Sequence, residues 1–189
     1  MQNLQLSKDE KITLLKLARK ALENKFSGQK DPVLTDPTEN LKAFCGAFVT
    51  LRKHNQLRGC IGYIKGIKPL WEEIVNLAKE AAFHDPRFYP LRPEELKEVE
   101  IEISVLTPLQ KISDTSLIEV GKHGILIKRG FFQGLLLPQV AIEENWDRET
   151  FLDHTCLKAG LYPGCWKDEK TEIYIFEALV FSEKEVGLK

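Results

Sequence analysis

The sequence has no apolar run of about 18 residues, the length that a membrane-spanning helix requires. Residues 1–11 carry charged side chains and lack the apolar core of a secretory signal. The 27 basic and 28 acidic residues leave a net charge of -1, so no overall positive field favours nucleic acid. We therefore expect a cytoplasmic protein without a membrane partner, and the charge balance argues against nucleic acid as a partner.

Cysteine and histidine are also scarce, with four of each, and their spacing does not resemble that of metal ligands. The sequence lacks a phosphate-binding glycine loop, a dinucleotide fingerprint and a serine nucleophile elbow. We predict no metal site, and no cofactor is evident. In the cytoplasm cysteines are usually reduced, so thiols are expected at all four positions. These are Cys45, Cys60, Cys156 and Cys165.

What is present fits a globular chain, with 43% hydrophobic and 29% charged residues and no low-complexity segment. A length of 189 residues suits one domain, or two fused halves at about 7–107 and 108–189. Ser7 and Glu10 form a capping box that opens an amphipathic helix reaching about Lys25.

The rest of the chain predicts one order of elements twice, namely a hairpin, a helix and a strand. Apolar alternation and β-rich composition indicate the strands, and apolar residues at helical spacing indicate the helices. Adjacent hairpins favour an α+β fold with mainly antiparallel or mixed sheets flanked by helices. The first set comprises strands 43–52 and 57–63, helix 67–83 and strand 99–105; the second comprises strands 125–128 and 134–137, helix 148–159 and strand 172–181.

The run Leu57–Tyr63, LRGCIGY, is the most unusual strand, because glycines at 59 and 62 bracket a cysteine. Alternation places Arg58, Cys60 and Gly62 on one face. A guanidinium there would favour the thiolate and make Cys60 a nucleophile. The alternative is packing, because free cysteine often behaves as a small buried hydrophobe. Cys45 is expected to face Cys60 across the hairpin.

His84 and Asp85 form a second candidate site just after a predicted helix, with Arg87 close by. His84 could move protons while Asp85 orients its ring. The alternative is local: Asp85 makes a turn, Pro86 stops the helix, and His84 lies at the negative helix end. A third candidate is Gln139, a polar residue placed to face a cleft, whose alternative role is a loop side chain bonded to backbone.

Three ordered segments together resemble the AMMECR domain family: FVTLRKHNQLRGCIGY, AFHDPRFYPLRPEEL leading into VEIEISVLTPL, and HGILIKRGFFQGLLLPQVAIEENWD. The hexamer LRGCIG, Leu57–Gly62, is the hallmark of that family. The resemblance implies an α+β fold, a cytoplasmic protein, and a functional link to Memo-like and radical SAM proteins, as in the AmmeMemoRadiSam system. It implies no settled reaction. The matching positions are Arg58, Gly59, Cys60, His84, Asp85, Arg87, Phe88, Pro138, Trp146 and Asp147.

Two hypotheses follow. In an enzyme, Cys60 would be a nucleophile or redox thiol, Arg58 would bind an anionic group or lower the thiol pKa, and His84 or Asp85 would transfer protons. In a non-catalytic interaction or scaffold module, the motif strand would be structural, and Arg58 and Arg87 would hold the carboxylate or phosphate of a partner. Candidate ligand-binding residues are Gly59, Arg87 and Gln139, and the partner is an unidentified small molecule or protein.

Overall fold

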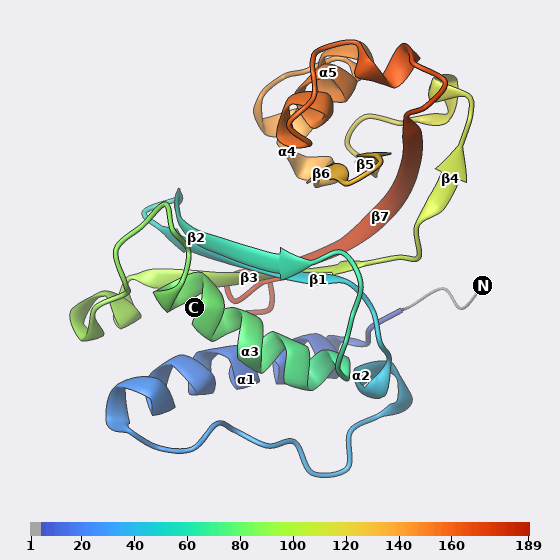
Figure 1. The fold of residues 1–189 in the computed structure, drawn as a ribbon. Coiled ribbons are helices and arrows are strands. Elements are labelled where there is room, and N and C mark those ends of the chain that lie inside the picture. The colour runs from blue at the N-terminus through green and yellow to red at the C-terminus, as the bar shows by residue number, and fades with distance from the viewer. Residues whose placement is uncertain (1–4) are drawn as a thin grey trace. The chain divides into compact units, whose positions relative to one another are not determined.

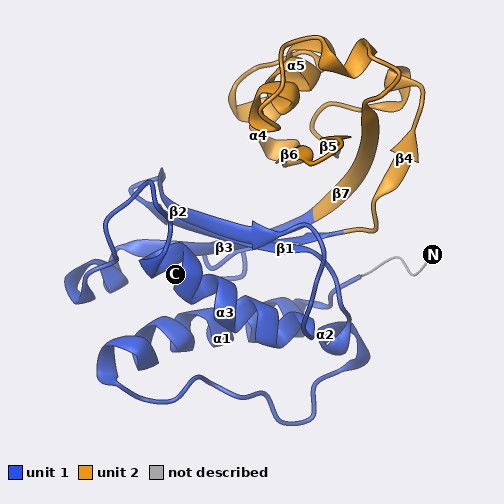
Figure 2. Ribbon diagram, viewed as in Figure 1, with its two compact units in different colours: residues 1–106, 179–189 blue, residues 107–178 orange. Residues whose placement is uncertain are grey.

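A computed structural model describes residues 5–189, which form two compact units (Figure 2). Unit 1 contains the chain up to Leu106 together with Leu179–Lys189, and unit 2 contains Thr107–Ala178. Strand β7 (Glu172–Ser182) contributes residues to both units. Whether the chain is one domain or two fused halves stays a prediction. The predicted lack of a signal rests partly on residues 1–4, which lie outside the described range.

Unit 1 begins with helix α1 (Lys8–Ser27), which starts and stops where its sequence indicates. The Ser7 amide donates to Glu10 Oε2 at 2.7 Å, and Glu10 N donates to Ser7 Oγ at 3.2 Å, so the predicted capping box is formed. Gly28 ends the helix with φ 68°, a left-handed conformation that glycine adopts without strain.

The strands of unit 1 form an antiparallel sheet in the order β2-β1-β3, followed by the C-terminal part of β7. Helices α1 and α3 cover one face of these strands (Figure 1). Pro69 is the residue before α3, where its missing amide costs little. The elements after α1 are α2 (Glu39–Lys42), β1 (Ala47–Lys53), β2 (Gln56–Tyr63), α3 (Leu70–Phe83), the 3-10 helix η1 (Pro93–Lys97) and β3 (Val99–Leu106).

Strand alternation divides the unit 1 sheet into an apolar face and a polar face. Val49 and Leu51 of β1, with Ile101 and Ile103 of β3, are fully buried against the helices. The residues between them point to the opposite face, because successive side chains of a strand alternate. That second face carries Phe48, Thr50 and Arg52 of β1, and Glu100, Glu102 and Ser104 of β3. We call it the polar face.

Unit 2 has its own core around Ile125, Phe151 and Ile175. Strand β5 pairs with β6 and β7, β4 also pairs with β7, and all these pairings are antiparallel. Asp147 caps α5 by accepting the Thr150 amide at 2.8 Å. The elements are β4 (Gln110–Ile112), η2 (Thr115–Leu117), β5 (His123–Arg129), β6 (Phe132–Leu136), α4 (Pro138–Glu143), α5 (Arg148–Lys158) and η3 (Cys165–Lys167).

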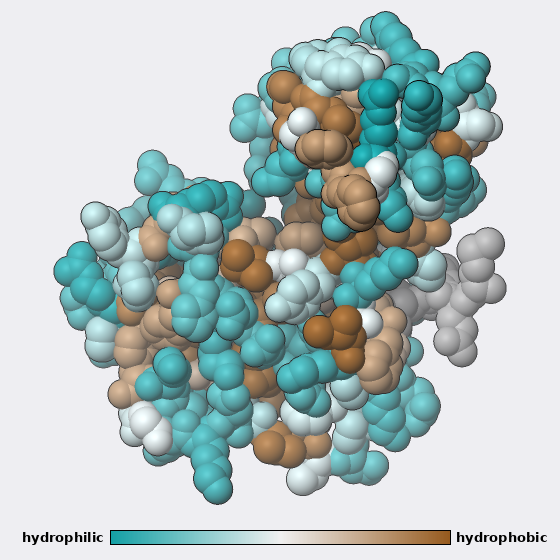
Figure 3. Space-filling model, viewed as in Figure 1, coloured by the Kyte–Doolittle hydropathy of each residue, from teal (hydrophilic) through white to brown (hydrophobic). Residues whose placement is uncertain are grey.

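The predicted α+β class is confirmed, and a hairpin followed by a helix and a strand occurs in both units. Five short elements were not predicted, namely α2, β4, α4 and the 3-10 helices η2 and η3. Pro138 begins α4, because proline is well suited to the first turn of a helix. Hydrophilic side chains dominate the visible surface, with smaller hydrophobic areas between them (Figure 3).

The prediction of four thiols is wrong for two of the cysteines. Cys156 and Cys165 form a disulfide, with their Cα atoms 6.0 Å apart, whereas Cys45 and Cys60 are free. A separation of nine residues matches no short motif. The two positions meet because the chain turns back between α5 and η3, a turn that the spacing of cysteines does not reveal.

Across residues 5–189, no helix combines the length and apolar character needed to cross a membrane. The same range contains no group of three or more His, Cys, Asp or Glu side chains arranged to hold a metal ion.

Candidate functional site

The cysteine of the LRGCIG motif belongs to a row of three side chains that crosses the polar face. Cys60 of β2 lies opposite Thr50 of β1, and Thr50 lies opposite Glu102 of β3. Thr50 Oγ1 donates to Cys60 Sγ at 3.2 Å. Cys45 precedes β1 and does not pair with Cys60, so the expectation that the two cysteines face each other was wrong.

The glycines of the motif allow close packing on both sides of β2. A Cβ atom at Gly59 would overlap the main-chain carbonyl oxygen of Ala81 in α3. A Cβ at Gly62 would overlap the ring of Phe48 on the polar face. Glycine at these two positions therefore lets a helix and an aromatic ring approach the strand. Gly59 faces α3 and not the side on which Cys60 lies.

Asp85 and Arg87 bind the backbone of Cys60 at the free edge of β2. The Cys60 amide donates to Asp85 Oδ2 at 2.9 Å, and Arg87 Nη2 donates to the Cys60 carbonyl at 3.2 Å. Arg87 Nη2 also donates to Asp85 Oδ2 at 2.7 Å, and its Nε donates to Oδ1 at 3.0 Å. These two side chains supply the hydrogen bonds that another strand would make at this edge, a form of edge protection.

This arrangement stabilises the charged form of the Asp85 carboxylate. The hydrogen bonds from Arg87 lower its pKa to about 2, although burial acts in the opposite direction. The Asp85 side chain is only 2% exposed, whereas that of Arg87 is 51% exposed. Asp85 is therefore a buried anion that fixes the position of Cys60 in the strand.

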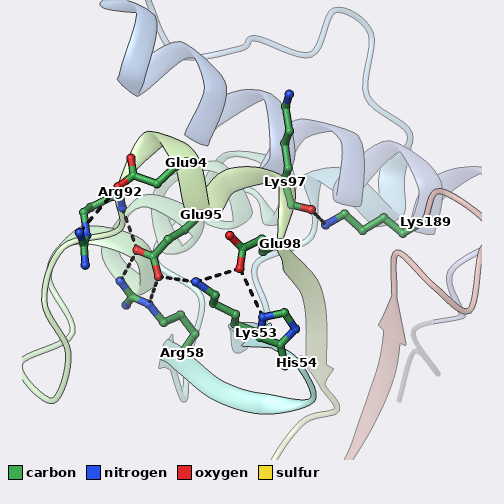
Figure 4. A network of polar contacts seen from close by, with 9 residues as sticks. All are labelled: Lys53, His54, Arg58, Arg92, Glu94, Glu95, Lys97, Glu98 and Lys189. Carbon is green, nitrogen blue, oxygen red and sulfur yellow. Dashed lines mark hydrogen bonds and ion pairs between the residues drawn. The ribbon is translucent and has the colours of Figure 1, made fainter.

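Arg58 does not contact the thiol. Its Nε donates to Glu95 Oε1 at 3.1 Å and its Nη2 to Glu95 Oε2 at 2.9 Å, and the pKa of Glu95 falls to about 2 chiefly because of these bonds. Lys53 forms ion pairs with both Glu95 and Glu98, and His54 lies within ion-pair distance of Glu98 (Figure 4). The charge of Arg58 is thus used in an ion-pair network that runs from η1 to the β1–β2 turn.

The Cys60 thiol is not activated in the predicted direction. Burial raises its pKa and is the largest cause of the shift. The hydrogen bond from Thr50 and the charge of Arg87 lower the pKa, while the charges of Asp85 and Glu102 raise it. Because the net shift is upward, Cys60 is a protonated thiol at neutral pH. The expected lowering of its pKa by Arg58 is not what the structure shows.

His84 lies at the end of α3 and does not pair with Asp85. Its Nδ1 lies 3.1 Å from Glu80 Oε1, and its side chain is 60% exposed. The Asp85 carboxylate accepts hydrogen bonds from the Cys60 amide and from Arg87 instead. The prediction that Asp85 orients the His84 ring is therefore wrong. The local alternative describes this residue better: its amide donates to the Glu80 carbonyl and ends the helix.

Gln139 is located in α4 of unit 2, whereas the other candidate residues belong to unit 1. Its Oε1 atom is buried and has no hydrogen-bond partner within residues 5–189. That observation argues against the simple alternative of a side chain whose oxygen is bonded to loop backbone. The prediction that Gln139 faces a ligand cleft stays a prediction.

The sequence interpretation missed three residues of the polar face, namely Thr50, which lies opposite Cys60, and Glu102 and Ser104 of β3. The alternation in residues 99–105, VEIEISV, already placed Glu102 and Ser104 opposite the apolar face. The sequence did not reveal the register in which β1 pairs with β2 and β3. That register places Thr50 between Cys60 and Glu102.

The profile of the AMMECR1 family matches residues 15–181. The chain belongs to the AMMECR1 family. A protein of Methanothermobacter thermautotrophicus is 46% identical over 190 residues, covering 97% of this chain and 99% of its own. Protein NEQ441 of Nanoarchaeum equitans is 48% identical over 179 residues, covering 91% and 99% of the two chains.

A solved structure is similar to this AMMECR1 chain in fold as well as in sequence. It is the crystal structure of the uncharacterized protein PH0010 from Pyrococcus horikoshii, with a TM-score of 0.86 and 41% identity. The match covers 92% of this chain and 91% of the other. These relatives establish the family and the fold, and their names state no activity.

A first prediction concerns the reactivity of Cys60. In a Cys45→Ala variant of the folded protein, we expect alkylation by iodoacetamide to be slow at pH 7 and to accelerate only at a pH higher than an unfolded cysteine requires, because burial raises the pKa of Cys60 and the protonated thiol is unreactive. Thr50→Val should shift this profile to still higher pH, since Thr50 lowers the Cys60 pKa. Mass spectrometry of the alkylated protein gives the rates. Fast alkylation at pH 7 would contradict the assignment of a protonated thiol.

Proposed function

We propose that this AMMECR1-family protein binds a small polar molecule on the polar face of unit 1. The observation that carries the proposal is the row formed by Cys60, Thr50 and Glu102, which places a thiol, a hydroxyl and a carboxylate side by side across three strands. Ser104 adds support, because it is 1% exposed and its Oγ has no hydrogen-bond partner within the described chain. A buried hydroxyl without a partner is costly unless something else satisfies it.

The groups of this row suit a ligand with both hydrogen-bond donors and acceptors. The Cys60 thiol is a weak donor in its protonated form, Thr50 offers a hydroxyl, and Glu102 offers acceptor oxygens. Arg52 lies 3.5 Å from Glu102 and offsets its charge. If the site is catalytic, Cys60 acts as a proton donor and not as a preformed nucleophile. Asp85 and Arg87 are then positioning residues, because they bind the Cys60 backbone.

Ligand-observed and backbone-amide NMR test this proposal. Free amino acids, nucleosides and small sugars serve as probes, each added to isotope-labelled full-length protein. We expect at least one class to shift the amides of β1, β2 and β3, and Thr50→Val or Glu102→Gln to weaken that binding about tenfold. Ser27→Ala, an exposed helix position in the same unit, is the matched control. Binding that maps to other elements, or that both variants retain, would refute the site.

A second candidate function is a non-catalytic interaction module in which LRGCIG is structural. It is favoured by the packing of Gly59 and Gly62 and by the internal ion pairs of Arg58 and Arg87. Cys60→Ser separates the two functions. A ligand role predicts weaker probe binding with little change in the free energy of unfolding, whereas a packing role predicts lost stability alone.

We also propose that the protein acts in the cytoplasm and is functionally linked to Memo-like and radical SAM proteins. The support is the family resemblance of the three sequence segments and the match to the AMMECR1 family. Size-exclusion chromatography of the purified proteins, alone and mixed, tests for a direct complex. Unchanged elution of all components at micromolar concentration would restrict the link to an indirect one.

A further inference from the structure

The disulfide of unit 2 lies inside the hydrophobic core of that unit. Cys156 is near the end of α5 and Cys165 begins η3, and both residues are completely buried. They belong to the same apolar cluster as Phe151 and Ile175. Solvent and dissolved reductants therefore cannot reach either sulfur while this part of the chain is folded.

The segment that the disulfide closes has little regular structure of its own. Between the two cysteines, Gly160 and Gly164 adopt left-handed conformations, with φ of 78° and 83°. Asp153 adds side-chain hydrogen bonds, because its Oδ1 accepts from the Gly164 amide at 2.7 Å and from Trp166 Nε1 at 2.8 Å. A glycine-containing segment gains much from a covalent link, because the link limits the many conformations of that segment in the unfolded chain.

Unit 2 has further reason to depend on this link. Its described α-helices are short, with six residues in α4 and 11 in α5, and short helices are marginally stable by themselves. A small unit also buries little apolar surface, which limits its stability. Unit 1 contains no disulfide, and its two cysteines are free. The covalent constraint therefore acts on one of the two units.

We propose that Cys156–Cys165 is a redox-dependent staple that sets the stability of unit 2. In its formation the two thiols lose two protons and two electrons as the S–S bond forms. The oxidant is a small-molecule or protein disulfide, which accepts the electrons and protons and becomes two thiols through a mixed-disulfide intermediate. Because both sulfurs are buried, oxidation and reduction require the segment from α5 to η3 to open.

Thiol counting tests whether the staple exists. Full-length protein is incubated with oxidised glutathione, unfolded in guanidinium with iodoacetamide, and measured by mass spectrometry. We expect two alkylated cysteines, Cys45 and Cys60, and an intact bond between Cys156 and Cys165. Four alkylated cysteines would overturn the proposal.

Hydrogen exchange tests whether the staple acts on unit 2. After reduction with dithiothreitol, we expect α5 amides to exchange about a hundredfold faster, the effect estimated for opening a loop of this size. Amides of α1 in unit 1 should be unchanged. The Cys156→Ala/Cys165→Ala variant should exchange fast with or without reductant, and Cys45→Ala should respond as the unaltered protein does. If the α5 amides exchange at the same rate before and after complete reduction, the disulfide does not set the stability of unit 2.

Discussion

Replacement of Asp85 with alanine is expected to destabilise unit 1 by about 2–3 kcal/mol, because the Cys60 amide loses a charged hydrogen-bond acceptor. The change takes away the acceptor of the Cys60 amide and leaves Arg87 without its carboxylate. Because both groups lie at the edge of β2, that edge loses the bonds that substitute for a neighbouring strand. Urea unfolding at pH 7, followed by circular dichroism, measures the change in free energy.

Two variants make the Asp85 result specific. Glu80→Ala removes the exposed contact to His84 and should cost less than about 1 kcal/mol, as for surface ion pairs. Asp85→Asn keeps an oxygen that can accept the Cys60 amide but loses the charge, so an intermediate cost is expected. If all three variants unfold at the same urea concentration as the unaltered protein, the backbone contacts of Asp85 do not stabilise the fold.

The depressed pKa of Asp85 also predicts how its contribution varies with pH. The folded pKa is about 2 and the ordinary value is 3.8, so the folded state favours the charged carboxylate. This contribution, about 2 kcal/mol, is fully present above pH 3.8 and is lost as the pH falls through about 2. Asp85→Asn should therefore be less sensitive to acid over this range than the unaltered protein, which urea unfolding at several pH values will show.

Replacement of Gly59 with alanine is expected to cost about 3 kcal/mol, at the upper end of the range for overpacking. The added Cβ would overlap the main-chain carbonyl of Ala81, and a helix backbone cannot move away as a flexible side chain can. The strand and α3 must therefore separate at this point. We expect the variant to unfold at a lower urea concentration than the unaltered protein.

Gly130→Ala is the control for Gly59→Ala. Gly130 has open space around its Cα and a φ of 60°, so alanine there should cost only the strain of a left-handed backbone, about 1 kcal/mol. A Gly59→Ala effect no larger than that of Gly130→Ala would mean that α3 does not pack closely on the motif strand.

Much of the fold could be predicted from local patterns. The capping box at Ser7 located the start of α1, Asp147 located the start of α5, and alternation in residues 99–105 located β3. These signals involve neighbouring residues, and the forces that they report act over one or two turns. The short helix α4 and strand β4 lack enough residues to produce a periodic pattern.

Less of the candidate site could be predicted. The sequence identified Cys60, Asp85 and Arg87 as candidates, but not that Asp85 and Arg87 bind the Cys60 backbone. It paired Arg58 with the thiol, whereas Arg58 binds Glu95, 37 residues away in the sequence. Charged side chains accept many partners, and their choice depends on which loops the fold brings together.

The sequence by itself determined the family, the α+β class and the presence of a cysteine between two glycines in LRGCIG. These properties follow from residue order and short-range periodicity. The tertiary structure alone decided that Cys60 lies beside Thr50 in a row with Glu102, that burial raises the pKa of its thiol, and that Cys156 and Cys165 are joined. The row depends on strand register, the thiol pKa depends on burial, and the disulfide depends on a reversal of the chain. Register and burial arise from contacts between residues that are distant in the sequence, and the reversal arises from the path of the chain in space.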